Sequence, residues 1–136
     1  MSALLHKAQR ALDSAKLLLS AGDMDGAVNR AYYSMFDAAK AALTEGDEPM
    51  ISQPIKSHNG LITLFSQHLV KTGHVSNDLG KHLNEVEELR LIADYKAEDM
   101  ITSERAAWAV EAAEGFVGAM DDLIDDLNQP SPGPSM

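Results

Sequence analysis

One arginine in the second half of the sequence stands between two carboxylates. Arg90 follows Glu87 by three residues and precedes Asp94 by four, so a helix would place all three side chains on one face. An ion pair within the helix explains this spacing. Because Leu89 and Ala93 beside it are apolar, the guanidinium could instead lie in a groove, where its planar fork suits a phosphate.

A cluster of aromatic residues stands earlier in the chain. Asn29 and Tyr33 are four residues apart, as are Tyr32 and Phe36, so each pair would share a helix face. Tyrosines that pack between helices with their hydroxyls hydrogen-bonded would explain the cluster. The alternative is a binding surface, in which Arg30 and Tyr33 contact a ligand.

A third cluster opens a helix. The run Lys56-Ser57-His58-Asn59-Gly60 supplies polar side chains at a helix N-terminus. Free backbone amides and the helix dipole favour anions there, so Lys56 and His58 are candidates for holding a phosphate. Plain capping of the helix by Ser57 is an equally good interpretation.

Several common chemistries have no signal in this sequence. There is no GxGxxG, GxxxxGK[ST], HExxH or GxSxG motif, and no Glu-x-x-His pair of a di-metal bundle. The five histidines lack ligand spacing, and the absence of cysteine excludes disulfides and thiolate sites. We therefore expect neither a metal nor another cofactor.

Helical periodicity runs through nearly the whole chain and must position these clusters. Apolar residues recur at steps of three and four, and no segment shows the alternation of a strand. The predicted fold is all-α, an up-and-down bundle of four long helices plus a shorter fifth. The predicted helices run from about Leu4 to a break at Gly22 and Asp23, from Asp23 or Asp25 to near Gly46, from Ser57 to the Lys71-Thr72-Gly73 stop, from Asn77 to Tyr95, and from Thr102 or Ser103 through Leu127.

Length and charge bound the remaining possibilities. The 136 residues suit one domain, predicted over 1–128, with a disordered Pro/Ser tail over 129–136. No segment resembles a signal peptide or membrane span, so a cytoplasmic protein without membrane contact is expected. Of the net charge of −10, −8 falls within residues 98–126. This acidity disfavours broad nucleic-acid binding, and no DNA binding is predicted, although a small local basic site remains compatible with it.

The order of these segments resembles that of the HEPN family (higher eukaryotes and prokaryotes nucleotide-binding). The segments are a long first helix, NRAYYSMFDAAKAAL, KSHNGLITLFSQHLVKTG, LRLIADY and an Ala-rich last helix. The match covers about residues 4–125 and is most similar to the small stand-alone prokaryotic members. The resemblance implies a five-helix bundle that forms a homodimer, paired with a minimal nucleotidyltransferase as a toxin–antitoxin system. The broad apolar arc of the last helix also favours a dimer.

The resemblance also implies an activity. Active members are metal-independent endoribonucleases, in which an Arg stabilises the phosphorane and a His four to six residues later moves a proton. Arg90 matches the Arg, but the expected His positions hold Asp94, Tyr95, Lys96 and Ala97, and no His follows Arg90. His58 could approach Arg90 from the third helix and replace the missing base.

Two functional hypotheses follow. The first is a dimeric module that binds nucleotide or RNA phosphate through Arg90, with Arg30, Tyr33, Lys56 and His58 as further ligand contacts. The alternative is an endoribonuclease toxin with a rearranged catalytic site of Arg90, Asp94 and Tyr95. A purely structural role, in which the acidic last helix docks a basic partner, is a third possibility.

Overall fold

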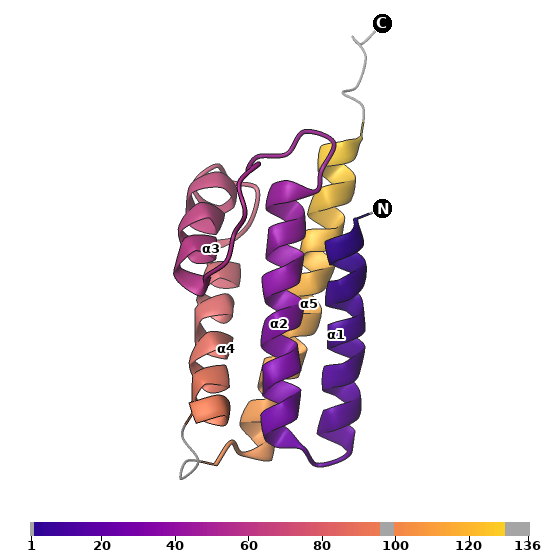
Figure 1. Cartoon of the computed structure of the whole chain (residues 1–136), viewed down its shortest axis with the longest axis vertical. Coiled ribbons are helices and arrows are strands. Elements are labelled where there is room, and N and C mark those ends of the chain that lie inside the picture. Colours follow the sequence, from indigo (N-terminus) through magenta and orange to yellow (C-terminus); the bar gives the residue numbers. More distant parts are fainter. Residues whose placement is uncertain (1, 96–99, 130–136) are drawn as a thin grey trace, which may run out of the picture.

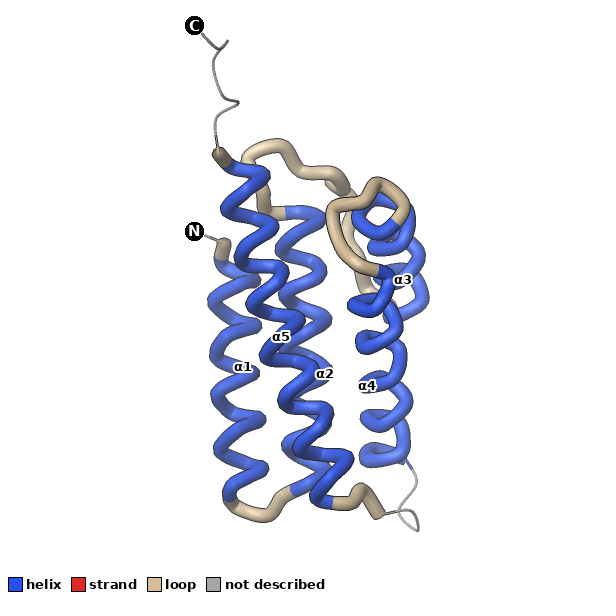
Figure 2. Tube along the Cα trace, turned by 180° about the vertical axis from the view of Figure 1, so that it is seen from behind, coloured by secondary structure: helices blue, strands red, loops and turns tan. Residues whose placement is uncertain are grey.

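A computed structural model describes residues 2–95 and 100–129. Five α-helices occupy most of this range, and no strand occurs within it. The long helices alternate in direction along the chain and form the predicted bundle (Figures 1 and 2). The helices are α1 (Ala3–Ser20), α2 (Met24–Thr44), the short α3 (His58–Phe65), α4 (Asn77–Tyr95) and α5 (Ser103–Asn128).

Helix α2 lies at the centre of the bundle and packs against α1, α3, α4 and α5. Twelve of its 21 residues are buried, against five of 18 in α1, because α1 has only one side covered. Much of the buried surface is alanine, which lets neighbouring helices approach closely. The fully buried alanines of these two helices are Ala8, Ala15, Ala27, Ala31, Ala38, Ala39 and Ala41.

The predicted helix boundaries agree with the structure, with two refinements. Asp23 rather than Asp25 caps α2, by accepting a hydrogen bond from the Gly26 amide at 2.9 Å. The third helix is not α-helical throughout, because its last turn widens into a π-helical segment, η1 (Ser66–Val70). There the Lys71 amide donates to the Ser66 carbonyl, five residues earlier.

The loop between α2 and α3 sets the position of the third helix. Its Asp47 amide donates to the Asn128 side chain at 2.8 Å, and Ile55 is buried. Ser57 caps α3 as expected, by accepting from the Gly60 amide at 3.0 Å. This path brings the start of α3 beside the middle of α2 (Figure 1), where His58 meets Tyr32.

Two expectations concern features that the structure does not test. Apart from Gln129, the predicted tail 129–136 lies outside the described residues. The cytoplasmic location stays a prediction; among the described helices, none combines the length and hydrophobicity that crossing a bilayer requires.

The alanine-rich packing of α2 predicts intolerance of larger side chains. Replacing fully buried Ala38 with Leu adds three carbons to a filled interior and should lower the free energy of unfolding by about 1–3 kcal/mol. Urea denaturation measures the change. Ala107→Leu on the exposed side of α5 is the matched control and should change stability by less than about 0.5 kcal/mol. Equal effects of the two substitutions would contradict a tightly packed α2.

Candidate functional site

Arg90 on α4 is held by carboxylates of its own helix. Its Nε and Nη2 donate to the two oxygens of Glu87 at 2.9 and 3.0 Å, and its Nη1 donates to Asp94 at 2.9 Å. Only 12% of the Arg90 and Glu87 side chains is exposed. The hydrogen bonds to Glu87 raise the pKa of Arg90, against the opposing effect of burial, so the guanidinium stays charged.

Two tyrosines of α2 pack against this guanidinium. Its Cζ lies 4.9 Å from the ring centre of Tyr32 and 5.6 Å from that of Tyr33. The two rings meet edge to face at 5.2 Å. Tyr32 is 2% exposed and Tyr33 is 37% exposed, so the first forms the floor of the site and the second its rim.

The Tyr32 hydroxyl is hydrogen-bonded to His58 at the start of α3. Its oxygen lies 2.9 Å from His58 Nδ1, while His58 Nε2 lies 2.8 Å from Asn84 Oδ1 on α4. A carbonyl oxygen only accepts, so Nε2 carries a hydrogen, and in that tautomer of the uncharged ring Nδ1 accepts from the Tyr32 hydroxyl. Burial, followed by the Glu87 charge, raises the pKa of Tyr32, so the phenol keeps its proton at neutral pH.

Asp94 links α4 back to α2. Besides Arg90, it accepts hydrogen bonds from the Asn29 side-chain amide at 3.3 Å to both of its oxygens. Its side chain is 27% exposed, which makes it the more accessible of the two carboxylates that hold Arg90. The site therefore contains a cation, two carboxylates and aromatic rings, with the cation already neutralised from inside the chain.

The structure brings together four of the seven predicted site residues. Arg90, Asp94 and Tyr33 are in one cluster, and His58 joins it through Tyr32 rather than by touching Arg90. Tyr95, the last residue of α4, has a side chain 76% exposed, and no contact within the described residues joins it to Arg90. Whether any of these residues acts on a ligand stays a prediction.

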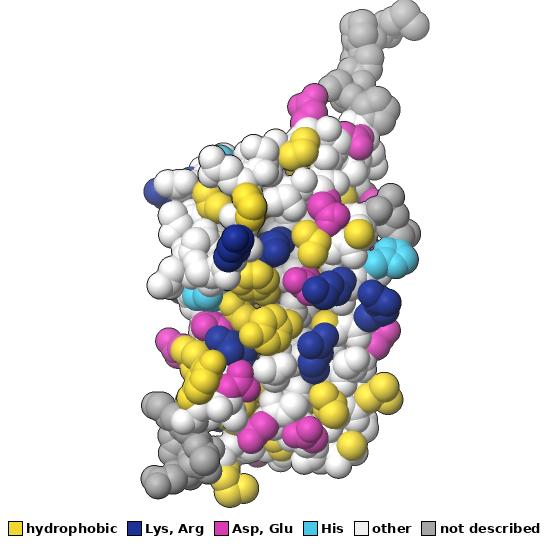
Figure 3. Space-filling model, in the orientation of Figure 1, with side chains coloured by type: hydrophobic (Ala, Val, Ile, Leu, Met, Phe, Trp, Pro, Cys, Tyr) yellow, Lys and Arg dark blue, Asp and Glu magenta, His cyan; other side chains and the backbone are white. Residues whose placement is uncertain are grey.

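The other two predicted residues lie outside the cluster. Arg30 acts through its charge on Asp37, together with Lys7 of α1 and Lys40 of α2. Lys56 is exposed and lines a hollow of about 590 Å³ with Lys40. Figure 3 shows that Lys and Arg side chains gather over α1 and α2, next to hydrophobic side chains at the α2–α4 contact.

Tyr32, Asn84 and Glu87 belong to the cluster in addition to the residues predicted from the sequence. The sequence pattern favours packing for Tyr32, and Asn84 belongs to another turn of α4. The missed signal is the spacing of Asn84, Glu87, Arg90 and Asp94, which advances by three, three and four residues along one helix face. Such a polar row needs partners on neighbouring helices. Helix α2 supplies them for Arg90 and Asp94, and His58 of α3 supplies one for Asn84.

The comparisons with known proteins agree with this architecture. The family model described as "HEPN domain" matches residues 1–123. A "UPF0332 protein" of Thermotoga maritima is 35% identical over 124 residues, which cover 91% of this chain and 90% of that relative. A "Putative toxin MJ0605" of Methanocaldococcus jannaschii is 32% identical over 128 residues, covering 93% and 90%. A second protein of that archaeon, "Putative toxin MJ0142", is 32% identical over 115 residues, covering 84% and 74%.

This chain is a small helical domain, a bundle with a polar cluster between α2 and α4. It is similar to bacterial and archaeal proteins over most of its length. The chain belongs to the HEPN domain family. The resemblance inferred from the order of its segments is thereby confirmed.

Arg90 should contribute to stability through Glu87. Arg90→Ala leaves a largely buried carboxylate without its two hydrogen bonds and should lower the free energy of unfolding by about 1.5–3 kcal/mol. Urea denaturation provides the measurement. Lys16→Ala, which removes the exposed Lys16–Glu114 pair, is the control and should cost less than about 1 kcal/mol. A loss for Arg90→Ala no larger than the control would show that Glu87 does not depend on Arg90.

Asp37 should make stability depend on pH. Burial raises its pKa more than the charges of Lys7, Lys40 and Arg30 lower it. A folded-state pKa above the unfolded one gives stability that is present at low pH and lost as pH rises through the folded pKa. Asp37→Asn should therefore match the parent protein near about pH 3 and be more stable near about pH 7, as judged from urea midpoints. A variant less stable at neutral pH would mean that attraction to the three cations outweighs burial.

Proposed function

We propose that this protein binds nucleotide or RNA phosphate at Arg90 and does not cleave RNA. It would act as a homodimer in a toxin–antitoxin-like pair with a nucleotidyltransferase-type partner. The family membership and the relatives named as toxins support the setting. The observation that carries the proposal is the hydrogen bonding of His58. Its Nδ1 is hydrogen-bonded to Tyr32 and its Nε2 to Asn84.

A general base must have a free lone pair within reach of the proton that it removes. His58 has none in this arrangement, and Tyr32 keeps its proton because of its raised pKa. Binding makes a smaller demand, namely a rigid cation and accessible aromatic surface. Arg90 provides the first and half-exposed Tyr33 the second, because a base can stack on its ring.

Asp94 controls access to the cation. A phosphate that approaches Arg90 must compete for Nη1 with Asp94 and meets its negative charge. Glu87 occupies Nε and Nη2 from the more buried side, so Asp94 is the group that has to move. Binding at Arg90 is therefore weaker than the same guanidinium would otherwise allow.

This arrangement distinguishes binding from catalysis with one substitution. Asp94→Asn removes a like charge beside the incoming phosphate and should tighten binding of a short RNA roughly fivefold. Fluorescence anisotropy with a labelled oligoribonucleotide measures the affinity, and gel analysis of the same samples with chelator present measures cleavage. Tyr33→Ala should weaken binding by about five- to 100-fold if a base stacks on its ring.

Asp78→Asn is the matched control, since it removes the same charge from the exposed first turn of α4, about 18 Å along the helix from Arg90. It should leave binding unchanged. Equal affinities of the Asp94 and Asp78 variants, or no binding by any variant, would overturn the proposal of phosphate binding at Arg90.

The alternative of an endoribonuclease rests on the short path from His58 through Tyr32 to Arg90. It requires the Tyr32–His58 bond to open so that Nδ1 can accept a proton from a 2′-hydroxyl. In that case chelator-resistant cleavage would be seen in the parent protein and lost in both His58→Asn and Arg90→Lys. Cleavage of that kind would replace the binding proposal.

A further inference from the structure

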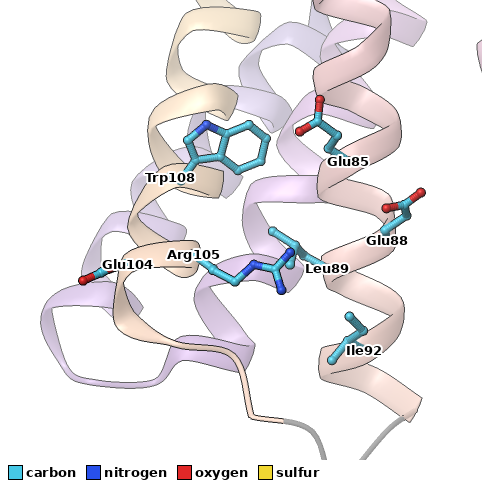
Figure 4. A pocket seen from close by; sticks show the side chains of 7 residues that line it. All are labelled: Glu85, Glu88, Leu89, Ile92, Glu104, Arg105 and Trp108. Atoms are coloured by element: carbon cyan, nitrogen blue, oxygen red, sulfur yellow. The ribbon is translucent and has the colours of Figure 1, made fainter.

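A groove runs between α4 and α5, on the other side of α4 from the Arg90 cluster. It has two sections of about 310 and 340 Å³, and Trp108 of α5 lines both. The side chains in the first section come from both helices, and Arg105 extends across it toward Leu89 (Figure 4). The apolar side chains along the groove are Leu79, Leu89, Ile92, Trp108, Ala112 and Phe116.

Four glutamates line this groove. Glu85 and Glu88 belong to α4, and Glu104 and Glu111 to α5; all four are exposed. Within residues 2–95 and 100–129, none of them forms an ion pair or a hydrogen bond through its carboxylate. Four carboxylates stand beside an apolar floor with one cation, Arg105, between them, so negative charge outweighs positive charge along this groove.

The dimensions of the groove match a helix. From Leu79 to Ile92, α4 follows it for fourteen residues, or about 20 Å. A helix of about four turns would fill that length and bury one apolar stripe on the floor. Gly115 leaves room at one end, since a side-chain carbon placed there would meet nothing within 4 Å.

We propose that this groove, defined by Trp108, Glu85, Glu88, Glu104 and Glu111, docks a basic amphipathic helix of a partner protein. Leucine-like side chains would pack on Trp108, and lysines or arginines would pair with the glutamates. The position of Arg105 supports this chemistry, because the chain's own guanidinium already lies over the apolar floor (Figure 4).

Charge complementarity decides between occupants of this groove. A second copy related by two-fold symmetry would present the same acidic rim, so carboxylates would face carboxylates across the contact. A nucleic acid would be repelled by the same groups. A partner helix with cations flanking an apolar stripe satisfies both the floor and the rim.

Trp108 lines the groove and is the single tryptophan of the chain, so its fluorescence reports directly on binding in the groove. The probe is a 14-residue peptide of leucine and lysine in a helical pattern, titrated into the full chain. Trp108 emission should shift to shorter wavelength as the peptide covers the indole, and raising the salt concentration should weaken binding. A peptide with glutamate in place of each lysine should cause no shift.

Two variants test whether the groove itself binds the peptide. The triple change Glu85→Gln, Glu88→Gln and Glu104→Gln should weaken binding at least tenfold. Its matched control, Asp122→Asn with Asp125→Asn and Asp126→Asn, removes the same charge from exposed positions near the end of α5 and should change affinity less than threefold. Gly115→Leu, which adds bulk inside the groove and leaves the charge unaltered, should weaken binding at least fivefold.

The outcomes that overturn the proposal are distinct from those for the phosphate site. Equal weakening by the two triple variants would mean attraction to overall charge and no docking groove. If the glutamine variant instead changed the molar mass by light scattering while no peptide bound, the groove would be a contact between copies of this chain. Neither result depends on Arg90, which the variants leave untouched.

Discussion

The packing of α2 against its neighbours is the constraint on which the rest of the structure depends. A helix covered on most of its circumference has little room for large side chains, and α2 meets this limit with alanines at six of its twelve buried positions. The neighbouring helices can then approach closely, and dispersion contacts accumulate along the whole length of the contact. The few large or polar groups that α2 does bury are held in defined positions as a consequence.

Tyr32 is the clearest case of this effect. It is buried on the face of α2 toward α4, so its hydroxyl must find a partner inside the bundle. The partner is His58, which lies within hydrogen-bonding distance because the loop between α2 and α3 places the start of α3 beside the middle of α2 (Figure 1). Asn84 then satisfies the other ring nitrogen. A requirement for hydrogen bonding thus connects three helices around one phenol.

Electrostatics divides α4 into two faces with different roles. Toward α2, Arg90 is neutralised by Glu87 and Asp94, so the polar row is satisfied within the chain. Toward α5, Glu85 and Glu88 have no such partner among the described residues, and their carboxylates are exposed beside an apolar surface. Helix α4 therefore carries, on its α2 side, a polar network whose hydrogen bonds are made within the chain. On its α5 side it carries exposed carboxylates beside an apolar groove.

The sequence by itself determined the helices, because apolar periodicity and capping residues are local properties. Asp23, Ser57 and Thr102 cap the N-termini of α2, α3 and α5, which are positions predicted from the sequence. The segment Asn77–Tyr95 is helical as predicted. The ion pairing of Arg90 with Glu87 and Asp94 was also readable, since it lies within one helix. Only the tertiary structure decided that His58 binds Tyr32 and Asn84, that Arg30 lies outside the Arg90 cluster, and that Tyr95 is exposed. Those outcomes depend on the rotation of each helix about its axis and on the path of a loop, which are set by packing between distant segments and leave no local pattern in the chain.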